Sequence, residues 1–240
     1  MNLTDALLDP LLGADRMGPR ITYYDDSCGE RIELSTVTLA NWAAKTANLL
    51  RDELDAGPES RVAVLLPAHW QTVAVLLGAW WIGAEVVLSG EPADIALCTI
   101  DRLAEADRTV ADSSGTAEVA VLSLDPFGRP VPDLPFGVTD YATAVRVHGD
   151  QVVPEQAPGP ALAGWSVEEV LRHARRSAEA RGLTAGDRVM SDRTWSTPRE
   201  LTDHLLAVLA AGASLVQLTN ADPAVLDRRR VTEKVTRSLD

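Results

Sequence analysis

The sequence predicts an α/β fold in which mainly parallel sheets are flanked by helices. Short apolar runs typical of strands alternate with longer segments whose apolar residues recur at helical spacing. The same order of parts then occurs twice: helix, glycine turn, Arg-Val strand, proline, helix ending in Gly-Ala, and strand. We therefore expect two similar βαβ-rich layers.

Two pairs of dipeptides mark this repeat. Arg61-Val62 matches Arg188-Val189, and Gly83-Ala84 matches Gly212-Ala213. The alternative is a chance resemblance, because βαβ units are common among α/β proteins. On the repeat reading, residues 1–240 form a single domain. Its first half covers about 20–148, its second half covers about 165–240, and a proline-rich connection at 149–164 joins them.

We expect a short helix ahead of the first half, which then begins with a hairpin and two helix–strand pairs. Gly29 lies in the hairpin turn, and Thr38 is the expected N-cap of the next helix. Gly57-Pro58 ends that helix, Pro67 ends the following strand, and Gly83 ends the second helix. The expected elements are a helix at 3–12, strands at 21–24 and 31–34, a helix at 39–54, a strand at 61–66, a helix at 69–82 and a strand at 84–88.

Two proline-rich loops, at 125–139 and 149–164, interrupt the remaining chain. We expect the first to be an ordered crossover, because apolar residues are spaced between its prolines. Ser166 and Glu169 fit a capping box, and Pro198 suits a first helical turn. The apolar residues of the first loop are Phe127, Val131, Leu134 and Phe136. The expected elements are strands at 94–98, 118–124, 188–191 and 213–218, and helices at 100–106, 140–147, 166–181, 198–212 and 222–239.

The composition excludes several classes of partner. The chain has a formal net charge of −13 and a sequence pI of about 4.7, so nucleic acid and anionic membranes would be repelled. The N-terminus lacks the basic region of a signal peptide. The apolar run at 73–82 is too short to span a bilayer. Cys28 and Cys98 stand at no metal-ligand spacing. We expect a cytoplasmic protein with reduced thiols.

Several segments resemble the N-terminal half of the adenylate-forming superfamily, which includes acyl-CoA synthetases, adenylation domains and luciferases. The matching segments are 21–23, 61–67, 76–88, 186–190 and 205–216, within a resemblance that covers about two thirds of the chain. Each motif alone is weak, but their order and spacing are moderately specific. The resemblance implies the fold of the N-terminal part of these enzymes.

The same resemblance exposes a defect in the expected ATP site. The family holds ATP phosphates in a loop rich in Ser, Thr and Gly that ends in Lys-Gly, where backbone amides cradle the anion. The matching stretch, 151–164, contains no lysine and no hydroxyl side chain, and its prolines remove amide donors. Residues 113–116 resemble such a loop, but they precede a strand and lack the lysine, so a surface turn is the better interpretation.

We therefore expect no catalytic residues, no cofactor, and no binding of ATP or AMP. The family also needs a Tyr-Gly-x-Thr-Glu segment, an Asp that holds the ribose, and a C-terminal domain with a catalytic lysine. The sequence ends at Asp240 before any of these, so a truncated form is expected. Lys234 lies among arginines and is expected to be solvated.

Four residues are candidates for a ligand pocket. Thr194 and Trp195 follow a second-half strand, where the resemblance implies part of an acyl pocket. His69 and Trp70 begin the equivalent first-half helix, at the strand ends where open α/β sheets bind ligands. A packing role for the tryptophans and a structural or solvated role for the histidine are the alternatives. No metal site is expected, since neither His173 nor His204 has a ligand at metal spacing.

Three hypotheses for function remain open. The first is a non-catalytic protein that keeps the family scaffold and binds a small molecule or a protein. The second is an acid-adenylating ligase that a partner chain completes. The third is an unrelated α/β binding protein. A protein partner or a homo-oligomer is possible in each case, because an exposed tryptophan would favour association. Trp80 and Trp81 are adjacent on a helix, so their side chains cannot point in the same direction. We expect one of them to pack in the core and the other to cover an exposed patch.

Overall fold

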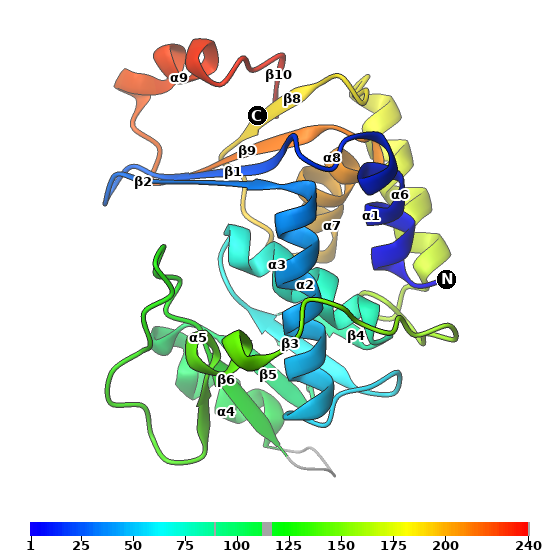
Figure 1. Cartoon of the computed structure of the whole chain (residues 1–240), viewed down its shortest axis with the longest axis vertical. Helices are drawn as coiled ribbons and strands as arrows, with labels where there is room; N and C mark the ends of the chain where they lie inside the picture. The colour runs from blue at the N-terminus through cyan, green and yellow to red at the C-terminus, as the bar shows by residue number, and fades with distance from the viewer. Residues whose placement is uncertain (89, 112–116, 240) are drawn as a thin grey trace. The chain divides into compact units, whose positions relative to one another are not determined.

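The computed structural model describes residues 1–88, 90–111 and 117–239, and the chain forms two compact units. Unit 1 comprises Met1–Ala6, Ala40–Pro67 and Gln71–Val167, and unit 2 comprises Leu7–Leu39, Ala68–Trp70 and Glu168–Asp240. Each unit contains one five-stranded sheet (Figure 1). The predicted α/β class, with mainly parallel sheets and flanking helices, is confirmed.

The helices largely follow the predicted pattern. They are α1 (Leu3–Ala14), α2 (Thr36–Asp52), α3 (Trp70–Trp81), α4 (Leu103–Val110), α5 (Tyr141–Ala144), α6 (Val167–Ala180), α7 (Pro198–Leu201), α8 (Ala207–Ala210) and α9 (Leu226–Thr232). Short 3₁₀ turns are η1 (Ile100–Arg102), η2 (Val145–Val147) and η4 (Pro223–Val225), and a π-helical turn, η3 (Thr202–Leu206), joins α7 to α8. Within the described ranges, no helix has both the length and the apolar character that crossing a membrane requires.

The sheet of unit 1 is entirely parallel, in the order β4-β3-β5-β6-β7. Its strands are β3 (Arg61–Leu65), β4 (Glu85–Val87), β5 (Ile95–Cys98), β6 (Glu118–Val121) and β7 (Val138–Asp140). All four residues of β5 are buried, as expected for a strand covered on both faces. Ala106 and Val110 of α4 pack into the core of this sheet.

The sheet of unit 2 has the order β10-β8-β9-β1-β2. Its strands are β1 (Pro19–Asp25), β2 (Glu30–Ser35), β8 (Arg188–Ser191), β9 (Ser214–Thr219) and β10 (Arg237–Leu239). The predicted hairpin is present, because β1 and β2 pair antiparallel while the other pairs are parallel. Buried Met190, Val216 and Leu218 form a core cluster, against which Leu226 and Val235 pack.

Local signals explain how several elements begin and end. Thr197 accepts a hydrogen bond from the Glu200 amide (3.1 Å) and caps α7, which Pro198 opens as predicted. Gly83 and Gly212 have φ values of 79° and 80°, a left-handed conformation that glycine adopts without strain. Both glycines therefore end their helices, as the sequence indicated.

Three expectations about particular elements are wrong. The helix expected at 222–239 ends at Thr232, and the chain then forms β10 beside β8. Trp80 and Trp81 are both buried, and the indole of each donates a hydrogen bond inside unit 1. Thr38 is not the N-cap of α2, which begins at Thr36; instead the Thr38 amide donates to Ser35 Oγ at 3.2 Å. The loop-like motif at 113–116 lies outside the described residues.

Candidate functional site

A crevice in unit 2 is expected at the carboxyl ends of β8 and β9. The connection from β8 through α7 and α8 leads to β9 on one side, whereas the connection from β9 through α9 leads to β10 on the other side of β8. Because such crossovers are right-handed, the two connections lie on opposite faces of the sheet, as Figure 1 shows for α9 relative to α7 and α8. Open α/β sheets bind ligands where neighbouring connections diverge in this way.

Two buried polar side chains belong to these strand ends. Gln217 of β9 is 1% exposed, and its Nε2 donates to the carbonyls of Arg193 and Leu218, both at 3.1 Å. Trp195, in the loop after β8, is 4% exposed. Gln217 Oε1 and Trp195 Nε1 have no hydrogen-bond partner among the residues that the structure describes. One acceptor and one donor are thus left at the same pair of strand ends.

The loop after β8 is held in shape by Glu200. Its Oε2 accepts hydrogen bonds from the Ser196 amide (2.9 Å) and from Thr194 Oγ1 (3.2 Å). Thr194 is exposed, whereas Trp195 is buried. Both residues follow β8, where the sequence placed them, and the contact of either side chain with a ligand stays a prediction.

His69 and Trp70 lie in unit 2 beside the first strand. The His69 ring meets the Tyr23 ring edge to face at 4.3 Å, and the Trp70 ring lies 5.6 Å from His69. His69 Nε2 is 3.8 Å from Glu30 Oε1. Burial lowers the pKa of His69 despite the nearby Glu30 carboxylate, and burial raises the pKa of Tyr23 to about 12. Both rings are therefore neutral at physiological pH.

The segment that carries His69 is tied to the end of β9. Thr219 Oγ1 donates to the carbonyl of Ala68 at 3.5 Å, and Thr219 is the last residue of β9. The four predicted pocket residues therefore all belong to unit 2, and all are near the carboxyl ends of its strands in the fold. Nothing in the periodicity of the sequence indicated that residues 68–70 would join this unit.

An ion-pair network, which the sequence did not predict, joins the C-terminal turn of unit 2 to its sheet. Glu233 is 5% exposed. It accepts hydrogen bonds from Tyr24 Oη (2.6 Å), Arg31 Nε (3.0 Å) and Arg188 Nη2 (2.5 Å). Burial alone would raise the pKa of Glu233, but these hydrogen bonds, led by that from Arg31, lower it to about 2. The network is therefore charged, and it fixes the turn between α9 and β10.

In unit 1, the residues at 149–164, which we call the connecting segment, are bound along the edge strand of the sheet. Leu162 forms a parallel bridge with Val86 of β4. The Val86 amide donates to the Ala161 carbonyl, and the Ala163 amide donates to the Val86 carbonyl, both at 3.0 Å. Trp80 Nε1 also donates to the Ala161 carbonyl at 2.7 Å. The connecting segment is thus an added edge of this sheet.

The upstream part of the connecting segment is anchored in the same way. Asn48 Nδ2 on α2 donates to the carbonyls of Gly149 and Gln151, both at 2.9 Å. The Glu155 amide donates to the Trp81 carbonyl at 2.8 Å. A Cβ added at Gly83 would lie only 2.7 Å from the Cγ of Glu155, which is closer than two non-bonded carbon atoms can approach. A side chain at residue 83 would therefore displace the connecting segment.

Four consecutive amides of the connecting segment are bound to protein acceptors. Those of Ala161 and Leu162 donate to the Trp165 carbonyl (2.7 and 3.3 Å), and that of Ala163 donates to β4. The Gly164 amide donates to Glu85 Oε1 at 2.6 Å. A phosphate loop works by directing free amides at an anion. The four consecutive amides from 161 to 164 are instead occupied by protein acceptors.

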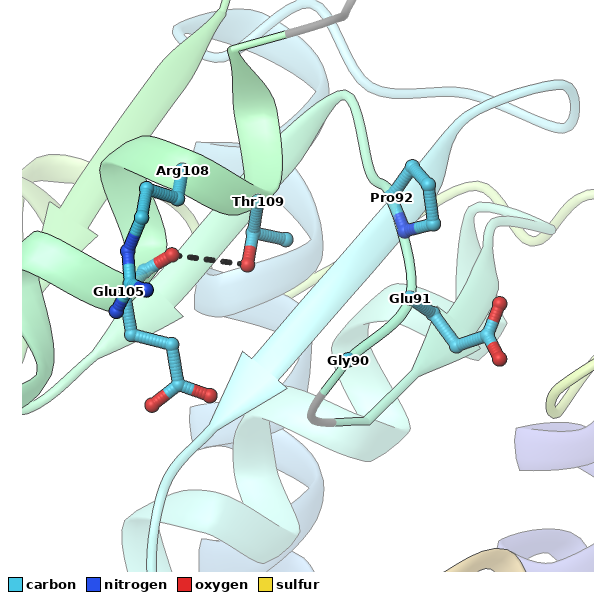
Figure 2. A pocket seen from close by; sticks show the side chains of 6 residues that line it. All are labelled: Gly90, Glu91, Pro92, Glu105, Arg108 and Thr109. Atoms are coloured by element: carbon cyan, nitrogen blue, oxygen red, sulfur yellow. Dashed lines mark hydrogen bonds between the residues drawn. The ribbon is translucent and has the colours of Figure 1, made fainter.

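The cavities found among the described residues lie elsewhere and are less suited to a ligand. One of about 400 Å³ in unit 1 lies between residues 90–92 and α4 (Figure 2). Figure 2 shows Glu105, Arg108 and Thr109 together on that helix, with the Thr109 hydroxyl bonded to the Glu105 carbonyl (2.9 Å). The Glu105 carboxylate also pairs with Arg102 at 2.7 Å. Three of its six lining residues are charged, namely Glu91, Glu105 and Arg108, whereas most small-molecule sites have a predominantly apolar lining.

Two smaller cavities, of about 290 and 280 Å³, occur in unit 2 at the amino ends of its strands and beside α9. Lys234 lines the first and is exposed, in keeping with the expectation that it is solvated. Among the described residues, no group of three or more His, Cys, Asp and Glu side chains is placed to hold a metal ion.

Comparison with solved structures shows the fold. The Brucella canis acyl-CoA synthetase has a TM-score of 0.78 at 19% identity, the anthranilate CoA ligase AuaEII in complex with anthranoyl-AMP has 0.74 at 14%, and a benzoate CoA ligase from Burkholderia xenovorans LB400 has 0.70 at 17%. They match 99–100% of this chain, which spans 47–50% of theirs. The chain therefore has the fold of about half of an adenylate-forming ligase, as the sequence resemblance predicted.

The sequence comparisons show the family. No protein-family model matches the chain. A protein of Mycobacterium tuberculosis (strain ATCC 25618 / H37Rv), described as a TIGR03089 family protein, is 71% identical over 237 residues. The match covers 99% of this chain and 98% of that protein. The chain therefore belongs to the TIGR03089 family.

Proposed function

We propose that this chain binds a small aromatic acid in unit 2 and does not activate it with ATP. The observation that carries the proposal is the state of the connecting segment. Its amides from 161 to 164 are bound to protein acceptors, and its sequence offers no lysine for a phosphate. Such a segment would have to leave its sheet before it could hold the phosphates of ATP.

The strand ends of unit 2 support the choice of ligand. Trp195 Nε1 is a donor for a carboxylate, and Gln217 Oε1 is an acceptor for an amino or hydroxyl group. A buried polar atom without a partner costs about 1–3 kcal/mol, so a ligand that satisfies both would recover that cost. Trp70 and Tyr23 supply aromatic surface in the same unit. Two solved ligases of this fold are named for anthranilate and benzoate, which favours a benzoate-like acid with a second polar group.

Calorimetric titration with aminobenzoate, hydroxybenzoate and cyclohexanecarboxylate tests this proposal. We expect saturable binding of the two substituted aromatic acids and weaker binding of the cyclohexane acid. Trp195→Phe keeps an aromatic ring but removes the donor, so it should weaken binding about tenfold or more. Trp42→Phe, in unit 1, is the matched control and should leave the affinity unchanged.

Two outcomes contradict the proposal. If none of the acids binds, or if Trp195→Phe binds them like the wild-type chain, the crevice is not the site. If the purified chain releases pyrophosphate from ATP in the presence of any of these acids, the non-catalytic part is wrong.

The second hypothesis, a ligase completed by a partner chain, is favoured by the similarity of fold to acyl-CoA and aryl-CoA ligases. It requires a partner that supplies both a phosphate loop and a catalytic lysine. Pyrophosphate release that appears only when a co-purifying chain is present would support it over our proposal. The third hypothesis, an unrelated α/β protein, required a different strand order, and the shared fold argues against it.

A further inference from the structure

Arg193 lies on the loop after β8, two residues before Trp195, and its backbone is fixed at the strand ends. Its amide donates to Ser191 Oγ at 3.2 Å, and its carbonyl accepts from Gln217 Nε2 at 3.1 Å. Both partners are buried. The Arg193 side chain therefore starts beside the amide group of Gln217, whose other atom, Oε1, has no partner among the residues that the structure describes.

The guanidinium of Arg193 is only weakly engaged. Its Nε is 4.0 Å from Asp192 Oδ1, a long distance for an ion pair, and the two side chains are 50% and 62% exposed. Exposed pairs contribute about 0–1 kcal/mol, so this contact holds the guanidinium loosely. Within the described part of the chain, the side chain makes no hydrogen bond to another residue. A half-exposed arginine on a fixed backbone can therefore turn toward a bound anion.

The other charged side chains of this loop and of α7 are engaged elsewhere. The Glu200 carboxylate is bonded to two donors of the loop. Arg199 is 90% exposed and pairs with Asp203 at 3.6 Å, one turn along the helix. Residues 192–200 contain two cations and two anions, so they hold no surplus positive charge for an acid. Of the two cations, Arg193 has the longer ion pair and the less exposed side chain.

A half-buried histidine on the connection from β8 to β9 senses the charge of Arg193. His204 lies in η3, and its Nδ1 is buried without a partner among the described residues. Burial, and then the positive charges of Arg181 and Arg193, lower the pKa of the His204 imidazole. The carboxylates of Asp203 and Glu200 raise that pKa. The charge of Arg193 therefore acts inward, on the helical connection that flanks the crevice, and not only on solvent.

We propose that the guanidinium of Arg193 binds the carboxylate of the acid in this crevice, together with the indole N–H of Trp195. This inference rests on the proposed function, and it makes charge the property by which the crevice selects an acid over a neutral analogue. A hydrogen bond between arginine and a carboxylate is charge-assisted and roughly twice as strong as a neutral one. The net charge of −13 repels an acid from the chain as a whole, and a cation at the crevice offsets that repulsion locally.

Calorimetric titration with aminobenzoate and with aminobenzamide, its neutral analogue, tests this assignment. Arg193→Gln should weaken the binding of aminobenzoate about threefold to tenfold at low salt and leave the affinity for the amide unchanged. The loss should shrink at about 1 M sodium chloride, where the Debye length is about 3 Å. Arg193→Lys keeps the charge and should retain most of the affinity. Arg199→Gln, which also removes one cation, is the matched control and should bind both compounds like the wild-type chain.

A nuclear magnetic resonance titration of His204 without any ligand tests the placement of Arg193 independently. Because the positive charge of Arg193 lowers the pKa of His204, Arg193→Gln should raise that pKa. Arg199→Gln should change it less. A His204→Gln variant assigns the signal among the four histidines of the chain.

The outcomes separate this inference from the proposed function on which it rests. If the wild-type chain binds aminobenzoate and Arg193→Gln binds it equally well, the inference is overturned while the proposed function stands. Equal losses for the acid and the amide also overturn it, because Arg193 would then only shape the loop. So does an unchanged pKa of His204 in Arg193→Gln. If the wild-type chain binds no aromatic acid, the proposed function fails, and this inference fails with it.

Discussion

Replacing Glu233 by glutamine is expected to lower the free energy of unfolding by about 3 kcal/mol. The carboxylate is buried between Arg31 and Arg188, so its loss leaves two cations without their central anion. The value is at the low end for a buried pair because Arg31 remains 44% exposed and partly solvated. Chemical denaturation of the variant and the wild-type chain measures the difference.

Glu105→Gln is the matched control for that measurement. Glu105 also pairs with an arginine, Arg102 at 2.7 Å, but both side chains are about one-third exposed. Exposed pairs contribute about 0–1 kcal/mol, so this variant should unfold nearly like the wild-type chain. Equal losses in the two variants would contradict the central role given to Glu233.

The same network predicts a dependence of stability on pH. The pKa of Glu233 is lowered from its ordinary value of 4.5 to about 2 in the folded chain. The folded state therefore binds fewer protons, and the contribution of this group is full above pH 4.5 and falls as the pH drops from 4.5 toward 2. In Glu233→Gln that contribution is absent. The difference in free energy of unfolding between the variant and the wild-type chain should therefore shrink as the pH falls from 4.5 to 2.

Trp80→Ala is expected to cost about 3–5 kcal/mol, the usual range for removing a large buried aromatic side chain. Trp80 is 2% exposed, and its indole donates to the Ala161 carbonyl of the connecting segment. Thermal and chemical unfolding measure the loss of stability. Limited proteolysis should also cut the variant between 149 and 164 sooner than it cuts the wild-type chain.

Trp80→Phe separates packing from anchoring. It keeps most of the buried volume and removes the indole donor, but the Val86 amide still donates to the Ala161 carbonyl, so it should cost about 0.5–1.5 kcal/mol, the net contribution of one hydrogen bond. If Trp80→Ala is unfolded, this milder variant still reports on the connecting segment through proteolysis. Unchanged cleavage in both variants would mean that the indole does not hold the segment.

The sequence predicted the fold class well because its signals are local. The hairpin at β1 and β2, the proline that opens α7 and the glycines that end α3 and α8 all follow from residues within one turn. That 151–164 is no phosphate loop, which its prolines and its lack of lysine predict, stays a prediction. The division into a first half at 20–148 and a second half at 165–240 stays a prediction. So do the single domain over 1–240 and the cytoplasmic location.

What the sequence missed depends on contacts between distant residues. Glu233 was expected in a long Arg-rich helix, and only the fold brings it to Tyr24 and Arg31, about two hundred residues earlier in the chain. The sequence predicted an ordered crossover at 125–139 from its apolar residues, but it did not indicate that Phe127 and Phe136 would both be exposed. At the candidate crevice, the loop could be located from its strand, but the unsatisfied atoms of Trp195 and Gln217 depend on packing that no local pattern encodes.

Hydrogen exchange at the amides from 161 to 164, with and without magnesium ATP, tests most directly whether the connecting segment is structural. These amides donate to Trp165, Val86 and Glu85, so we predict slow exchange that ATP does not change. Fast exchange in the free chain that becomes slow when ATP is added would contradict this account, because it would show free amides that close on a phosphate.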